Sequence, residues 1–200
     1  MTWVKVCGLR REYDVAAAVE AGADAVGFVL APESPRRVTE SRARSLAQGV
    51  PILSVIVTVD LTPAALMAAV VATGVGGVQP HGEHRWEAAA AAQREGLFVL
   101  HPLAVLARVD ISGIPQDQMP LLDTHRAGAH GGTGEQFDWA LIPDLGRRYV
   151  LAGGLGPDNV EEAVRRVAPW GVDASTGLES SPGVKDPERV RAFVERARGR

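Results

Sequence analysis

Cysteine and lysine are scarce in this 200-residue chain. It has one cysteine, Cys7, and two lysines, Lys5 and Lys185. A single cysteine cannot form an internal disulfide, which agrees with a reducing compartment. We attribute the shortage of lysine, beside abundant arginine and alanine, to a compositional bias and assign it no function.

The sequence also lacks a long apolar run and a strong excess of charge of either sign. Gly, Asp or Arg interrupts every apolar stretch before it reaches the roughly 18 residues that a membrane span needs. The beginning of the chain lacks the charged and apolar regions of a secretion signal. The formal net charge is −3 and the arginines are scattered, which excludes a broad basic field for nucleic acid. We therefore expect a cytoplasmic protein with no membrane or nucleic-acid partner.

The sequence does contain short apolar runs that alternate with helix-like segments, a pattern typical of parallel β/α units. The predicted strands are 4–7, 25–30, 52–57, 77–79, 97–101, 119–122, 149–151 and 172–174. The predicted helices are 11–21, 39–48, 62–73, 83–95, 157–168 and 187–198. Gly22 and Gly74 follow two of these helices, where a left-handed cap is needed, and Pro157 is expected to open another.

Eight parallel strands in 200 residues predict an α/β fold, a compact (β/α)8 TIM barrel that spans residues 1–200 as a single domain. A doubly wound open sheet is the alternative, and the strand count favours the barrel. Pro102, Gly113 and Pro115 interrupt the segment before the sixth strand. We therefore expect a degenerate fifth helix there.

The active site of such a barrel lies at the carboxyl ends of its strands. Cys7 ends the first predicted strand just before Gly8, a position that suits a reactive thiol. The alternative is a small buried hydrophobe, the usual state of a free cysteine. Asp123 follows the strand 119–122, where desolvation favours a neutral carboxyl group that can act as a general acid. The alternative is an aspartate that only caps the loop.

Several loops at the same end are candidates for binding. Three glycines around a threonine, at 131–134, make either a loop beside Asp123 that could close over a ligand or an ordinary flexible turn. The segments 151–159 and 173–177 follow the last two strands, where glycine-rich loops and a helix N-terminus usually hold phosphate. Arg36 is either a carboxylate clamp that uses two parallel hydrogen bonds or a solvated surface arginine. The five histidines form no known ligand pattern, so we expect no metal.

A series of motifs in order along nearly the whole chain resembles the phosphoribosylanthranilate isomerase family. The motifs are VKVCGL at 4–9, EAGADAVGF at 20–28, SPR at 34–36, VQ and HG at 78–79 and 81–82, GGTG and FDW at 131–134 and 137–139, AGGL at 152–155, GVD at 171–173 and PGVKD at 182–186. The ordered series is far more specific than any single motif in it.

The resemblance implies an Amadori rearrangement in tryptophan biosynthesis, from N-(5-phosphoribosyl)anthranilate to 1-(2-carboxyphenylamino)-1-deoxyribulose 5-phosphate, without a cofactor. Asp123 corresponds to the general acid and Cys7 to the general base, whose pKa a nearby positive charge would lower towards neutrality. Arg36 would hold the anthranilate carboxylate. The other implied substrate-binding residues are Gln79, His81, Gly132, Gly153, Gly154, Asp173, Ser175, Thr176 and Gly177. The partner is a phosphorylated small molecule, and the chain would be a monomer or a homodimer.

The chain departs from the family pattern at a few positions. Pro80 replaces a leucine and removes a backbone donor, Glu135 and Gln136 replace Gly-Lys in the loop, and the last strand ends Ala-Ser-Thr in place of Val-Ser-Ser. These changes affect affinity and loop motion more than reaction type. Two rivals remain: the related isomerase of histidine biosynthesis, which uses two aspartates, and a barrel that binds a phosphosugar without turning it over.

Overall fold

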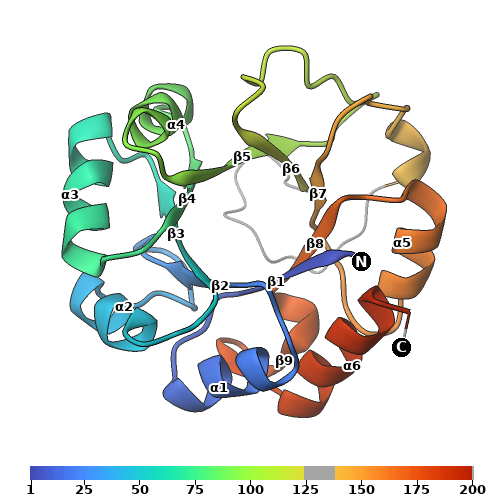
Figure 1. Ribbon diagram of the computed structural model, residues 1–200, viewed down its shortest axis with the longest axis horizontal. Helices are drawn as coiled ribbons and strands as arrows, with labels where there is room; N and C mark the ends of the chain where they lie inside the picture. Colours follow the sequence, from blue (N-terminus) through green and yellow to red (C-terminus); the bar gives the residue numbers. More distant parts are fainter. Residues whose placement is uncertain (124–137, 200) are drawn as a thin grey trace.

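A closed barrel of eight parallel strands forms the centre of the computed structural model, which describes residues 1–123 and 138–199 (Figure 1). The strands are β1 (Trp3–Cys7), β2 (Ala25–Val29), β3 (Leu53–Val59), β4 (Gly77–His81), β5 (Phe98–Ala104), β6 (Met119–Asp123), β7 (Val150–Leu151) and β8 (Gly171–Ala174). The barrel closes because β1 pairs with both β2 and β8. The predicted barrel is thus confirmed, and the open sheet is excluded.

Helices surround the strands (Figure 1). They are α1 (Glu12–Glu20), α2 (Glu40–Ala47), α3 (Pro63–Thr73), α4 (Arg85–Arg94), α5 (Val160–Val167) and α6 (Pro187–Ala197), with short 3-10 turns η1 (Trp139–Leu141) and η2 (Thr176–Leu178). Within the described ranges, no helix combines the length and the apolar character that crossing a membrane requires.

The ends of the helices show which local signals act. Thr62 caps α3 by accepting a hydrogen bond from the Ala65 amide, and Gly74 ends that helix with a left-handed φ of 72°. Gly22 is also left-handed after α1, as predicted. The prediction that Pro157 opens a helix is wrong, because α5 begins only at Val160. The side chain of Asn159 bonds to the preceding loop and keeps residues 157–159 in a turn.

Residues 105–118, between β5 and β6, form turns without a helix, which agrees with the degenerate fifth helix that we predicted. The buried side chains of Val109, Ile111 and Ile114 belong to the main apolar core and take the place of a helix on this flank. The segment therefore contributes to the apolar core without forming a helix.

The two ends of the barrel interior differ in chemistry. Trp3 stacks on Trp170 with ring centroids 5.2 Å apart and lies 6.0 Å from Phe98, and these rings pack against an apolar interior cluster. Lys5 and Cys7 lie further along β1, towards its carboxyl end. The amino end is therefore filled with apolar side chains, and polar groups gather at the opposite end.

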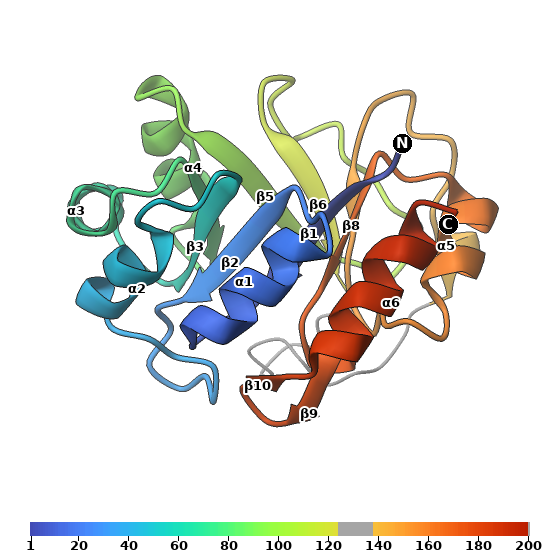
Figure 2. The same ribbon diagram turned by 60° about the horizontal axis from the view of Figure 1, so that its bottom comes forward.

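A small hairpin follows β8 that we did not predict. Strands β9 (Glu179–Ser181) and β10 (Val184–Lys185) pair antiparallel. Figure 2 shows this hairpin at the end of the barrel opposite the N-terminus, which is the end that carries the polar groups. The hairpin therefore adds residues to the edge of the candidate site.

Candidate active site

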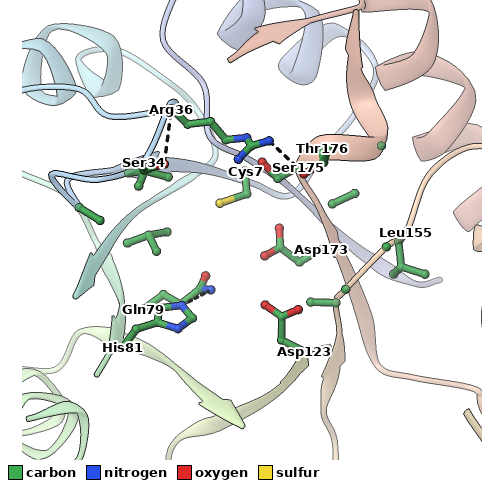
Figure 3. A pocket seen from close by; sticks show the side chains of 18 of the residues that line it. Cys7, Ser34, Arg36, Gln79, His81, Asp123, Leu155, Asp173, Ser175 and Thr176 are labelled. Atoms are coloured by element: carbon green, nitrogen blue, oxygen red, sulfur yellow. Dashed lines mark hydrogen bonds between the residues drawn. The ribbon is translucent and has the colours of Figure 1, made fainter. Parts of the chain in front are cut away.

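One pocket at the carboxyl ends of the strands brings together the residues that we predicted from the sequence (Figure 3). Eleven of the twelve predicted residues line it: Cys7, Arg36, Gln79, His81, Asp123, Gly153, Gly154, Asp173, Ser175, Thr176 and Gly177. The twelfth, Gly132, lies outside the described residues, as does the whole glycine loop at 131–134. These side chains come from both halves of the sequence.

The thiol of Cys7 and the carboxyl group of Asp123 point into the pocket from opposite sides (Figure 3). Gly8 turns the chain immediately after β1 with a φ of 78°. The neighbouring strand contributes Gly27, where an added Cβ would lie 2.7 Å from Cys7 Sγ and 3.1 Å from Lys5 Cε. Only glycine at that position leaves room for both side chains inside the barrel.

Lys5 lies fully buried beneath this pocket and is held by two strands. Its Nζ donates to Asp173 Oδ2 at 2.8 Å and to Gln79 Oε1 at 3.0 Å. Since Oε1 of Gln79 accepts from Lys5, its Nε2 is the donor towards His81 Nε2, at 3.1 Å. That network turns the amide nitrogen of Gln79 towards the ring of His81.

Charge and burial oppose each other at this pair of β1 residues. Burial raises the pKa of Cys7, and the Lys5 ammonium opposes that shift without cancelling it. Burial alone would lower the pKa of Lys5, but Asp173 and Cys7 together outweigh burial, so the pKa is raised and Lys5 stays charged. We expected a nearby positive charge to lower the pKa of Cys7 towards neutrality. Lys5 supplies that charge, but the net shift is upward, so the expectation is wrong.

Arg36 is buried at the rim of the pocket, which excludes the solvated surface arginine. Its Nε donates to Glu179 Oε1 at 2.7 Å, and its Nη2 donates to Glu179 Oε2 at 2.9 Å and to Thr176 Oγ1 at 3.0 Å. The pair of parallel hydrogen bonds that we expected for a ligand carboxylate is thus made with Glu179.

The two loops that we predicted as a phosphate site pack tightly against each other. Gly153 and Gly154 have left-handed φ values of 84° and 62°, which few other residues adopt. An added Cβ at Gly177 would lie 2.2 Å from the Leu155 carbonyl oxygen. The glycines therefore permit both the turn after β7 and the close approach of the loop after β8.

Three residues around the pocket were missed in the sequence: Lys5, Glu179 and Lys185. Both lysines of the chain are buried and paired with carboxylates, so the scarcity that we assigned to composition contained a usable signal. Lysine is seldom fully buried unless paired. Among the described residues, no group of three or more His, Cys, Asp or Glu side chains is placed to hold a metal ion.

A thiol and a carboxyl group across the mouth of a (β/α)8 barrel, beside two glycine-rich loops, define a barrel enzyme built for proton transfer. The family model for N-(5'-phosphoribosyl)anthranilate isomerase matches residues 4–196. An isomerase of that name from Thiobacillus denitrificans is 41% identical over 202 residues, 98% of this chain and 97% of the relative. This chain belongs to the N-(5'-phosphoribosyl)anthranilate isomerase family.

Solved structures agree with that assignment. The phosphoribosyl anthranilate isomerase of Thermus thermophilus superimposes with a TM-score of 0.87 at 33% identity, over 99% of each chain. Another isomerase of this family, in complex with reduced 1-(o-carboxyphenylamino)-1-deoxyribulose 5-phosphate, superimposes with a TM-score of 0.84 at 31% identity over the full length of both chains.

Proposed function

We propose that this chain carries out the isomerisation of its family with Asp123 as general acid and Cys7 as general base. The reaction is the Amadori rearrangement of N-(5'-phosphoribosyl)anthranilate in tryptophan biosynthesis. The single observation that carries the assignment is the position of the two groups, which face each other across one pocket (Figure 3).

The proposed steps move two protons. Asp123 donates its proton to the furanose ring oxygen, and the C1–O bond breaks to give an open-chain iminium ion. Cys7 removes the proton from C2, and the C–H electron pair forms the double bond of an enolamine. The enolamine then tautomerises to the ketone, so the atoms of the substrate and product balance without an oxidant or a reductant.

The raised pKa of Cys7 is compatible with this role. The iminium group makes the C2 proton acidic, so a base is needed only once the ring has opened. The Lys5 ammonium beneath the thiol favours the thiolate at that stage. A thiol that stays protonated until then is also less exposed to side reactions.

The two ends of the substrate are assigned to opposite edges of the pocket. The phosphate is assigned to the backbone N–H groups around Gly154 and Thr176, two residues that line the pocket in the loops after β7 and β8. The anthranilate carboxylate is assigned to Arg36. The complex of a relative with a reduced, phosphorylated product supports a ligand that carries both groups.

The domain organisation, cellular location and oligomeric state of the chain are part of the same proposal. We propose a single domain over residues 1–200 that acts in the cytoplasm, as expected of a biosynthetic enzyme. The isomerase of Thermotoga maritima is a dimer from which monomers have been generated. A monomer and a homodimer both fit this chain, and sedimentation at micromolar concentration distinguishes them.

The experiment that tests the proposal is a fluorescence assay of freshly generated phosphoribosylanthranilate. We expect Cys7→Ala and Asp123→Asn each to lower kcat by about two to four decades, the usual cost of removing a positioned proton-transfer group. The matched control is Asp117→Asn, an exposed aspartate in the turns before β6, which should leave kcat unchanged. A fully active Cys7→Ala would leave the reaction in place but remove the base from this thiol.

A further inference from the structure

Arg36 has five N–H donors, and the structure shows how three of them are used. The Nε donor and one Nη2 donor bind the two oxygens of Glu179, and the second Nη2 donor binds Thr176. In the described part of the chain, no group accepts from Nη1. A ligand can therefore bind the guanidinium through its Nη1 donors.

Glu179 is itself held in place by Lys185. The Nζ of Lys185 donates to Glu179 Oε1 at 2.8 Å and to the Ser175 carbonyl oxygen at 3.0 Å. The side chains of Glu179 and Lys185 are 4% and 0% exposed. Burial alone would raise the pKa of Glu179, but hydrogen bonds from Arg36 and Lys185 outweigh burial and keep its carboxyl group ionised.

The β9–β10 hairpin also contacts the loop that carries Arg36. An added Cβ at Gly183, in the turn of the hairpin, would lie 3.0 Å from the Pro35 carbonyl oxygen. Arg10 donates to that same oxygen at 3.2 Å. The turn of the hairpin therefore lies close to the residue just before Arg36 and to the Arg10 side chain that binds it.

We propose that Glu179 and Lys185 are positioning residues that hold the Arg36 guanidinium with Nη1 turned to the carboxylate of the substrate. With Arg36 and Lys185 protonated and Glu179 ionised, the cluster has a net charge of +1 beside an anionic ligand. Glu179 thus aligns Arg36 without neutralising the site. This inference rests on the proposed role of Arg36 in carboxylate binding.

The test compares two substrates that differ only in the carboxylate: phosphoribosylanthranilate and the corresponding adduct of aniline. The ratio of their kcat/KM values measures how strongly the enzyme recognises the carboxylate. We expect Glu179→Gln to lower that ratio roughly tenfold to hundredfold, mainly by raising the KM for the anthranilate adduct, because a charge-assisted hydrogen bond is lost or misaligned. Lys185→Met is expected to act in the same direction.

The control is Glu12→Gln, which breaks an exposed ion pair with Arg42 that also uses two hydrogen bonds. It should leave the ratio unchanged. Glu179→Asp keeps the charge on a shorter side chain and is expected to restore part of the ratio, and it serves as the readout if Glu179→Gln does not fold. A variant that slows both substrates equally would reduce Glu179 to a structural role and overturn the proposal.

Arg36→Met separates failure of this inference from failure of the proposed site. Loss of the ratio in Arg36→Met but not in Glu179→Gln would leave Arg36 as the carboxylate ligand and overturn the positioning role. A ratio unchanged by Arg36→Met would remove Arg36 from carboxylate binding and would overturn the inference with it.

Discussion

Cys7 illustrates how a strand can deliver a reactive side chain into a restrictive environment. The thiol is buried, lies beside a charged ammonium on the same strand, and rests over a glycine of the next strand. These neighbours have opposing effects on its ionisation, and burial dominates. The chemistry of Cys7 therefore depends on its surroundings as much as on the residue type.

We expect the pH dependence of Cys7 to show this balance directly. Because its pKa is raised, the thiolate fraction should still be increasing at pH values where an ordinary thiol is fully ionised. Alkylation by iodoacetamide measures that fraction, and Cys7 is the only cysteine, so no other thiol contributes. The same chain unfolded in urea is the control. Alkylation that levels off at a lower pH in the folded chain than in the unfolded chain would contradict the assignment.

Single residues differed in how far the sequence could predict them. The place of Cys7 and Asp123 in the pocket could be predicted because a strand end is a local feature with a known position in a barrel. Lys5 and Glu179 could not, because their partners Asp173 and Arg36 lie 168 and 143 positions away in the chain. Which charges pair depends on the closed barrel, and no local pattern encodes it.

At the scale of elements, the strands and the long helices could be predicted because their periodicity and caps are local signals. The β9–β10 hairpin could not, since its strands are only three and two residues long and, unlike the equally short β7, contain no apolar run. Its PGVKD segment contributed to the family resemblance but had no role assigned to it. The late start of α5 has a similar cause, because one asparagine side chain holds the loop before it.

Substitution of Asn159 tests whether the loop before α5 is organised to bind the substrate. Its Oδ1 accepts from the Gly156 amide and its Nδ2 donates to the Gly154 carbonyl, both at 2.9 Å. We expect Asn159→Ala to raise the KM of the substrate by up to roughly thirtyfold with little change in kcat, since two hydrogen bonds of about 1 kcal/mol each are lost. Inorganic phosphate should weaken as a competitive inhibitor by a similar factor.

The neighbour Asp158 provides a matched control. It has a fully exposed side chain that lies 3.6 Å from Arg196. Asp158→Ala should leave both constants unchanged, because an exposed pair of this kind contributes little. Equal effects of the two variants would show that the loop does not depend on the Asn159 contacts.

At the scale of the whole molecule, the barrel separates stability from chemistry. The amino end of the barrel interior and the layer between strands and helices are apolar, and among the described histidines only His101 is buried, between the strands and α4. Its Nδ1 lies 2.8 Å from Gln118 Oε1, and its ring lies 4.0 Å from the ring of Trp86. In the described residues, its Nε2 has no hydrogen-bond partner. A second proton, on Nε2, would therefore be a buried donor without an acceptor, so protonation of the ring is unfavourable.

We expect His101 to make the fold sensitive to acid. Burial lowers its pKa below the ordinary 6.5, so the unfolded chain binds a proton more readily than the folded chain. This contribution to stability is complete above pH 6.5 and is lost as the pH falls through the folded value. Urea unfolding at several pH values should show a smaller acid loss in His101→Asn, which keeps a donor near the Nδ1 position. His84→Asn, at an exposed histidine, should behave as the wild type.

The closure of the barrel between β1 and β8 also sets an order of events in time. Lys5 and Arg36 leave the ribosome early, and their counter-charges Asp173 and Glu179 leave it only when more than four-fifths of the chain has been made. Until then the nascent chain holds two cations that cannot be buried without cost. Contacts so distant in sequence also form slowly. The barrel therefore closes and the pocket is completed in the same late step. A ribosome-bound chain that ends before β8 should neither fold fully nor bind substrate.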